Sequence, residues 1–316
     1  MVVGLTGSLL VFIPELRRVE VPGWTKVVPT ARALPIQTSV DRLLAERPGD
    51  RLFSMSWEFK PDWALNLRTV APNGDRIHNF VNQYDGTLLA SVNYHHSKLQ
   101  WFYDLHADLL TGGSGRKVNA WFAFLLATCA TLGLLLWWRG IRYWKLGLEY
   151  RTQASWKRQS WDLHNLGGFI FYLPLLLLSL TGAYYAYEPE FGRVISAMTG
   201  GPSTIPPPKL QQSNDPWRPL DEIAKNALDA LPGSTLSMIN FPQKPGQAMS
   251  LRLKLPSDLH RIGLNWVYLD PMSGHVLRLD RFREQPLGVQ LMRLMTPVHY
   301  GTIGGYATRI LWIMAG

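Results

Sequence analysis

The sequence predicts an α-helical membrane protein in which four transmembrane helices, the first and last incomplete, carry two extracytoplasmic α+β domains. Three observations lead to this fold class: two long uncharged apolar runs, an internal duplication, and a basic segment between the runs. The composition agrees with it. Charged residues make up only 17% of the chain and aromatic residues 12%, yet the mean hydropathy is −0.04 because apolar blocks alternate with polar ones.

The two apolar runs predict membrane-spanning helices. Residues 120–138 and residues 163–187 each meet the roughly 20-residue length that a helix needs to cross a bilayer. Pro174 lies inside the second run and predicts a kink there. Trp or Tyr residues near the ends of both runs suit the membrane interface, so the lipid bilayer is an expected partner.

The chain ends carry shorter apolar runs, at residues 1–13 and 309–316. A signal peptide is the alternative for the first run, but no basic segment precedes it and no small-x-small cleavage pattern follows Ile13. Both ends are therefore expected to be parts of transmembrane helices, in a sequence that is a fragment truncated at both ends.

An internal repeat predicts the domain organisation. Leu-Thr-Gly at residues 5–7 and Pro-Glu at residues 14–15 reappear 175 positions later, at residues 180–182 and 189–190. A short amphipathic helix, a Pro-Gly pair, alternating strand-like segments and a turn follow in both copies. The expected segments are a partial helix at 1–14, an extracytoplasmic domain at 15–115, a helix at 116–138, a loop at 139–162, a helix at 163–187, a second extracytoplasmic domain at 188–303 and a partial helix at 304–316.

The charge distribution predicts the orientation. Basic residues crowd the loop between the two complete helices: Arg139, Arg142, Lys145, Arg151, Lys157 and Arg158, against Glu149 and Asp162. By the positive-inside rule this loop is cytoplasmic, which places both larger domains on the extracytoplasmic side of a bacterial plasma membrane. The net charge of +9 thus reflects membrane topology, and nucleic acid is not an expected partner. Cys129 is the single cysteine, so an intramolecular disulfide framework is excluded.

Five motifs carry a resemblance to a known family. They are GLTGSLLVFIPELRR at residues 4–18, SLTGAYYAYEPEFGR at 179–193, VYLDPMSGHVL at 267–277, LHNLGG at 163–168 and VHYGTIGG at 298–305. Taken in their order along the chain, they resemble the PepSY-associated transmembrane family, which includes iron-regulated membrane proteins and siderophore-iron reductases, over almost the whole chain. The resemblance implies four transmembrane helices and two extracytoplasmic PepSY domains. It also implies b-type haem held between helices by histidine, with electrons passed to a ferric siderophore. The shortened ends depart from the family pattern.

Three of the eight histidines are candidate haem ligands. An ionisable residue at membrane depth is costly without a partner and is a functional candidate, although a single interfacial histidine more often bonds a backbone carbonyl. His106 and His299 are repeat mates, each followed by a glycine pair, and we expect them to be the axial ligands of an outer haem. His164 opens a helix and is expected to hold an inner haem. A pairing of His164 with His299 is the alternative.

Glycines near these histidines leave space for a flat macrocycle. The predicted cofactor is one or two haem b, and the predicted cofactor-binding residues are His106, His164, His299, Gly112, Gly168 and Gly304. His78, His260 and His275 are expected on the surface of the extracytoplasmic domains.

Catalytic motifs of other kinds are absent from the sequence, including phosphate loops, HExxH, CxxC, nucleophile elbows and dinucleotide fingerprints. The expected function is haem-mediated electron transfer from a cytoplasmic or membrane donor to a ferric siderophore or other ferric chelate outside. The alternatives are a membrane-anchored PepSY binding or regulatory module, whose sheet edges could accept a partner strand, and an assembly subunit of an uptake system.

Overall fold

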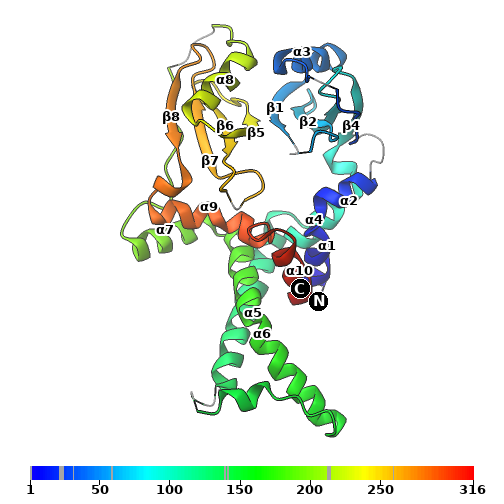
Figure 1. Cartoon of the computed structure of the whole chain (residues 1–316), viewed down its shortest axis with the longest axis vertical. Helices are drawn as coiled ribbons and strands as arrows, with labels where there is room; N and C mark the ends of the chain where they lie inside the picture. The colour runs from blue at the N-terminus through cyan, green and yellow to red at the C-terminus, as the bar shows by residue number, and fades with distance from the viewer. Residues whose placement is uncertain are drawn as a thin grey trace. The chain divides into compact units, whose positions relative to one another are not determined.

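The computed structural model describes residues 2–20, 25–30, 32–57, 60–138, 140, 142–211, 215–258 and 260–316 (Figure 1). The chain divides into two compact units. The helical unit comprises Met1–Val11, Phe102–Ile195 and Leu294–Gly316, and the sheet unit comprises Phe12–Trp101 and Ser196–Arg293.

The sheet unit contains one antiparallel sheet of eight strands in the order β4-β3-β2-β1-β5-β6-β7-β8. The strands are β1 (Arg51–Ser56), β2 (Leu65–Val70), β3 (Arg76–Val81), β4 (Leu88–Asn93), β5 (Thr235–Asn240), β6 (Met249–Lys254), β7 (Asn265–Leu269) and β8 (Val276–Asp280). Each repeat copy supplies four consecutive strands. The copies join where the first strand of each pairs with the other, with Met55 opposite Ile239.

One face of this sheet packs against two helices, α3 (Ile36–Glu46) and α8 (Leu220–Ala230) (Figure 1). Burial alternates along β2, β6 and β7, as expected for strands with one face turned to a core. The fully buried side chains at the centre come from both copies and include Leu43, Met55, Leu67, Ile223, Ile239, Met249, Leu251 and Leu269. The two copies therefore share one hydrophobic core.

The two helices cap one another. Both begin after a proline, Pro35 or Pro219, that supplies no side-chain cap. The Asp221 carboxylate accepts hydrogen bonds from the backbone N–H groups of Ile36, at 2.8 Å, and Gln37, at 3.1 Å. In return, the Gln37 side-chain carbonyl accepts from the N–H of Leu220 at 3.1 Å. Each helix thus satisfies free N–H groups at the start of the other.

Substitution of Asp221 should therefore lower the free energy of unfolding more than substitution of a neighbouring surface carboxylate does. We expect Asp221→Ala to lower the free energy of unfolding by about 1–2 kcal/mol, the usual value of a capping carboxylate. Asp229→Ala, which removes an exposed pair with Lys225 on the same helix, should cost less than about 0.5 kcal/mol. Thermal unfolding in detergent compares the two, and equal shifts would contradict the capping role.

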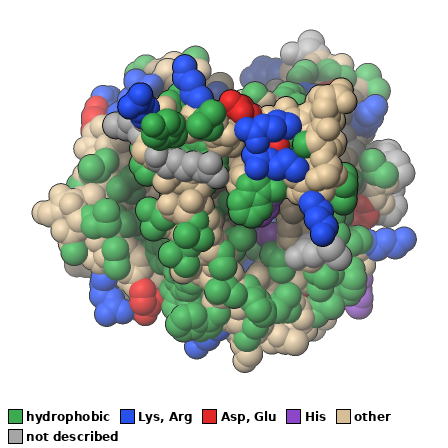
Figure 2. Space-filling view, turned by 90° about the horizontal axis from the view of Figure 1, so that it is seen from below, with side chains coloured by type: hydrophobic (Ala, Val, Ile, Leu, Met, Phe, Trp, Pro, Cys, Tyr) green, Lys and Arg blue, Asp and Glu red, His purple; other side chains and the backbone are tan. Residues whose placement is uncertain are grey.

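The helical unit is built on a pair of long helices, α5 (Gly113–Trp137) and α6 (Trp156–Tyr184), which pack along one another. Helix α6 runs continuously through Pro174. Hydrophobic side chains cover much of the face shown in Figure 2. Along the two helices the exposed large apolar side chains include Trp121, Phe122, Leu125, Leu132, Leu135, Leu136, Trp161, Ile170 and Leu173. Such exposure is unfavourable in water and suits contact with lipid.

The predicted four-helix transmembrane bundle is wrong. In the described part of the chain only α5 and α6 are long and apolar enough to cross a membrane. The apolar runs at the two ends form α1 (Val2–Leu10) and α10 (Gly305–Ala315), of nine and eleven residues, well short of the roughly 20 that a spanning helix needs. The fold is instead a two-helix hairpin with short helices and an eight-stranded antiparallel sheet.

Shorter elements complete the chain. They are α2 (Ile13–Glu20), η1 (Tyr94–His96), α4 (Lys98–Asp108), η2 (Trp144–Leu148), α7 (Glu188–Thr199), η3 (Phe282–Glu284) and α9 (Leu287–His299). The basic segment between α5 and α6 contains η2, and Arg158 forms a 2.9 Å ion pair with Asp162 inside α6. Arg139, predicted to belong to this segment, lies outside the described residues.

Candidate functional site

Two histidines face each other in the helical unit. His106 lies near the end of α4 and His299 is the last residue of α9, and their ring centroids are 6.0 Å apart with an angle of 42° between the ring planes. Both side chains are partly buried. The structure thus brings together the two histidines that occupy equivalent positions in the repeat.

A Leu-Thr-Gly motif holds each ring. His106 Nδ1 lies 2.9 Å from the backbone oxygen of Val3 and 3.3 Å from Thr6 Oγ1 on α1. His299 Nδ1 lies 3.0 Å from Thr181 Oγ1 on α6, and the ring also hydrogen-bonds to the backbone of Leu178. Because Val3 and Leu178, like Thr6 and Thr181, are separated by 175 positions, the two histidines have equivalent surroundings.

These contacts determine which ring nitrogen carries the proton. A carbonyl oxygen can only accept, so His106 Nδ1 must donate to Val3. Each threonine hydroxyl donates a hydrogen bond to a backbone oxygen of its own helix, Thr6 to Val2 at 2.9 Å and Thr181 to Leu177 at 2.5 Å. Each hydroxyl can therefore only accept a hydrogen bond from the imidazole. In both rings the lone pair is left on Nε2. Histidine ligands of metals are usually held in this way, through a hydrogen bond from the other nitrogen.

The motif glycines allow this close approach. A Cβ atom at Gly7 would lie 2.8 Å from His106 Cε1, and one at Gly182 would lie 3.3 Å from His299 Cε1. Carbon atoms in ordinary contact are about 3.5–4.0 Å apart, so a side chain at Gly7 would displace the ring. The glycines let each imidazole lie directly against the neighbouring helix.

Burial favours the neutral form of both rings. Burial lowers the pKa of His106. Burial, and then the proximity of His106, lower the pKa of His299 to about 4. Since a metal binds the unprotonated nitrogen, neither ring has to lose a proton before it can act as a ligand.

The separation of the ring centroids is compatible with a haem iron that both imidazoles would hold. With metal–nitrogen bonds of about 2 Å, imidazoles on opposite sides of one iron have ring centroids roughly 6 Å apart. The observed separation is 6.0 Å. Among the described residues, no three His, Cys, Asp or Glu side chains gather as a metal site would require. Zinc needs three or four protein ligands, whereas the porphyrin supplies four to iron and leaves one or two for histidine.

The other predicted site residues lie elsewhere. His164 is exposed on α6, 17 residues before Thr181, which corresponds to about 25 Å along a helix. His164 and His299 are therefore too far apart to share one iron.

The three predicted glycines do not flank the histidine pair. Gly112 and Gly168 have open space where a Cβ would be, and at Gly304 a Cβ would meet Thr308. Thr6, Gly7 and Thr181 were not predicted as site residues, although the repetition of their Leu-Thr-Gly motif was visible in the sequence. The motif and the histidines repeat at different offsets, so the repeat alone did not indicate that the motif contacts the histidines.

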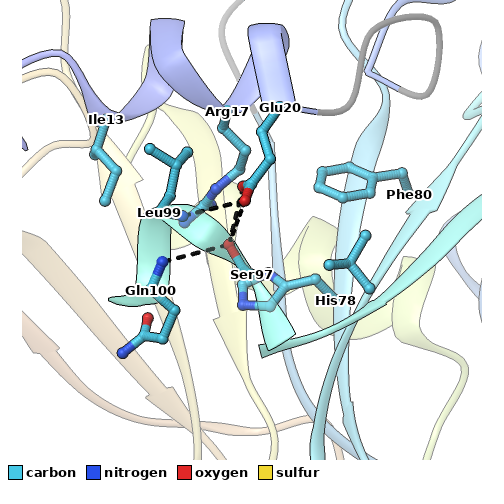
Figure 3. A pocket seen from close by; sticks show the side chains of 9 residues that line it. Ile13, Arg17, Glu20, His78, Phe80, Ser97, Leu99 and Gln100 are labelled. Atoms are coloured by element: carbon cyan, nitrogen blue, oxygen red, sulfur yellow. Dashed lines mark hydrogen bonds between the residues drawn. The ribbon is translucent and has the colours of Figure 1, made fainter. Parts of the chain in front are cut away.

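The sheet unit has a separate small cavity, of about 20 Å³ (Figure 3). Glu20 accepts hydrogen bonds there from Ser97 Oγ, at 2.9 Å, and from the backbone N–H of Leu99, at 3.1 Å, and so caps the start of α4. His78 also lines the cavity. Burial, and then the charges of Arg17 and Arg68, lower the pKa of His78 to about 3.

Two of the histidines expected on the surface are buried. His78 is 8% exposed and His260 is 7% exposed. A histidine at an alternating strand position cannot be assigned to the covered or open face from its own sequence, because the covering elements come from elsewhere in the chain.

Comparison with known proteins agrees with the resemblance seen in the motifs. A family model described as the PepSY-associated TM region matches residues 1–316, the whole chain. No curated protein matches the sequence. Together with the apolar helices α5 and α6, the match shows a membrane protein with a PepSY module. The chain belongs to the family of the PepSY-associated TM region.

Proposed function

We propose that this protein binds haem b between His106 and His299 and transfers electrons to a ferric siderophore or related ferric chelate. The observation that carries the proposal is the pair of imidazoles, whose ring centroids are 6.0 Å apart and whose Nδ1 atoms are both hydrogen-bonded. When bound, haem supplies a one-electron couple whose potential depends on its axial ligands. One electron from a cytoplasmic or membrane donor would reduce one ferric ion to ferrous.

The chain's own residues would orient the ligands and set their basicity. The Nδ1–H group of each ring donates to a threonine, Thr6 or Thr181, and to a backbone group, that of Val3 or Leu178. These hydrogen bonds keep Nε2 unprotonated. The basic segment between α5 and α6 supports a cytoplasmic position for that loop in a bacterial inner membrane, and so a periplasmic position for the sheet unit.

The test is a reduced-minus-oxidised visible spectrum of the full-length protein in detergent, with His106→Ala and His299→Ala. We expect the sharp bands of six-coordinate b-type haem in the native protein, their loss in both variants, and partial recovery with added imidazole. His164→Ala is the matched control and should keep this spectrum. A folded native protein that binds no haem would refute the proposal; loss of all haem only in His164→Ala would refute the His106–His299 pair.

A second effect concerns the threonines. Thr6→Val and Thr181→Val each remove an acceptor from Nδ1, so the imidazole donates less electron density and the ferrous state gains relative stability. We expect the midpoint potential to rise by on the order of 60 mV, which a tenfold change in relative affinity produces for one electron. Thr128→Val is the control, because Thr128 makes the same bond to its own helix at 2.9 Å on the exposed side of α5. Redox titration followed by absorbance measures all three.

A binding or regulatory module is the second candidate. Strand β8 forms one edge of the sheet, and its Val276 and Leu277 are each 40% exposed. Exposed strand edges can accept a strand from a partner protein. This function needs no histidine pair and would be favoured if the folded protein binds no haem.

A further inference from the structure

The sheet face away from α3 and α8 carries an arginine without an anionic partner. Arg252 on β6 lies directly opposite Trp266 on β7, with its guanidinium carbon 4.9 Å from the centroid of the indole ring. Its neighbours Leu251 and Leu253 point into the core, so Arg252 belongs to the face away from α3 and α8.

No residue in the described part of the chain forms a hydrogen bond or ion pair with the Arg252 guanidinium. Its Nε atom is enclosed and has no hydrogen-bond partner. The terminal nitrogens are not among the fully buried polar atoms that lack a partner, so they are not completely enclosed. A guanidinium normally bonds a carboxylate, a phosphate or a carbonyl when it is this far removed from water.

The carboxylate opposite Trp266 on the next strand is already shared by two other arginines. Asp280 lies opposite Trp266 on β8 and is 1% exposed. It pairs with Arg278 at 2.8 Å and with Arg293 at 2.6 Å. Two guanidinium groups therefore share this single carboxylate, and the charge of Arg293 also acts on Arg252, which leaves an excess of positive charge.

The ionisation of nearby groups agrees with this excess. Burial, and then the charge of Arg293, lower the pKa of Arg252 to about 10. Burial, and then Arg252, lower the pKa of His260 to about 4, so that ring adds no charge. An anion bound at this position would attract Arg252 and so offset its repulsion from Arg293.

The first copy of the repeat has a different arrangement. There Arg68 lies opposite His78, and Val92 takes the register position that Asp280 occupies in the second copy. The combination of an indole platform, a shared carboxylate and an unpaired guanidinium is thus not reproduced by the repeat. It is present at one position of the sheet.

We propose that Arg252, stacked on Trp266 and flanked by Arg293, binds the carboxylate of a small anionic ligand. The indole ring restrains the planar guanidinium, and the terminal nitrogens offer two parallel donors to the two oxygens of a carboxylate. The same chemistry is present in a free carboxylate chelator and in its anionic ferric complex. The inference is independent of haem binding at His106 and His299.

The probes are citrate and ferric citrate, titrated by calorimetry into the full-length protein in detergent at constant ionic strength. We expect the native protein to bind the probe and the affinity to fall at least about tenfold in Arg252→Gln. The loss should be smaller in Arg252→Lys, which keeps the charge but lacks the planar pair of donors of a guanidinium. Arg76→Gln is the matched control, because Arg76 stacks on Phe53 at 5.1 Å but is exposed. It should bind as the native protein does.

The two probes distinguish the sources of the carboxylate. Tighter binding of ferric citrate supports a ferric chelate as the ligand, and equal binding supports the free carboxylate. No citrate binding to the native protein, or equal binding in Arg252→Gln and Arg76→Gln, would overturn the proposal. If Arg252→Gln does not fold, Arg252→Lys and Trp266→Phe provide the same comparison. Haem content, measured separately by absorbance, keeps this outcome distinct from that of the proposed function.

Discussion

Gly7→Ala is expected to abolish six-coordinate haem, whereas Gly182→Ala is expected only to weaken it. The added Cβ would lie 2.8 Å from His106 Cε1 in the first variant and 3.3 Å from His299 Cε1 in the second. The first distance forces the His106 ring away from α1 and breaks its bond to Val3, while the second needs a shift of a few tenths of an ångström. Loss of a ligand-orienting contact typically lowers metal affinity 10- to 100-fold, and we expect Gly7→Ala at or beyond the upper end.

Absorbance gives the measurement, as the ratio of haem to protein and the proportion of six-coordinate spectrum. Gly133→Ala on α5 is the control, because a Cβ there meets no other atom within 4 Å and alanine favours a helix. Were Gly7→Ala to retain haem as well as Gly133→Ala does, His106 could not be held against α1 as described.

Asp280→Ala should destabilise the sheet unit more than any exposed charge substitution. The side chain is almost fully buried and neutralises part of the charge of Arg278 and Arg293. Its removal leaves the guanidiniums of Arg278 and Arg293 without their carboxylate, and breaking a buried pair in this way costs about 3–5 kcal/mol. Thermal unfolding in detergent, followed by circular dichroism, should show a correspondingly lower midpoint.

Glu190→Ala provides the comparison. Glu190 pairs with Arg193 at 3.1 Å, but both side chains are mostly exposed, so its loss should cost less than about 1 kcal/mol. If both substitutions had the same small effect, the charges around Asp280 would be well solvated, and the case for an anion at Arg252 would weaken as well. Citrate should partly restore the stability of Asp280→Ala if Arg252 binds carboxylates.

Much of the organisation could be predicted because it depends on local patterns. The uncharged runs at 120–138 and 163–187 correspond to the two long helices, since length and apolarity alone decide whether a helix can cross a bilayer. The family resemblance, carried by ordered short motifs, is confirmed over residues 1–316. The prediction of a four-helix bundle was wrong because it counted the end runs, which form helices of nine and eleven residues, as parts of spanning helices.

The site was predictable only in part. Repeat symmetry suggested that His106 and His299 lie near each other, and their rings are 6.0 Å apart. The haem between them stays a prediction. The partners of Nδ1 were not predicted, because Thr6 and His106 are 100 positions apart and no local pattern links them.

By itself the sequence determined the duplication, the two long apolar helices and the repeated histidines, all of which are properties of neighbouring residues or of a constant offset. Only the tertiary structure decided that β1 and β5 join the copies in one sheet, that Asp221 caps a helix of the other copy, and which glycines approach the histidines. Strand order, capping across copies and ring contacts depend on which surfaces meet. Alternation and periodicity specify that a face is buried, but not what buries it.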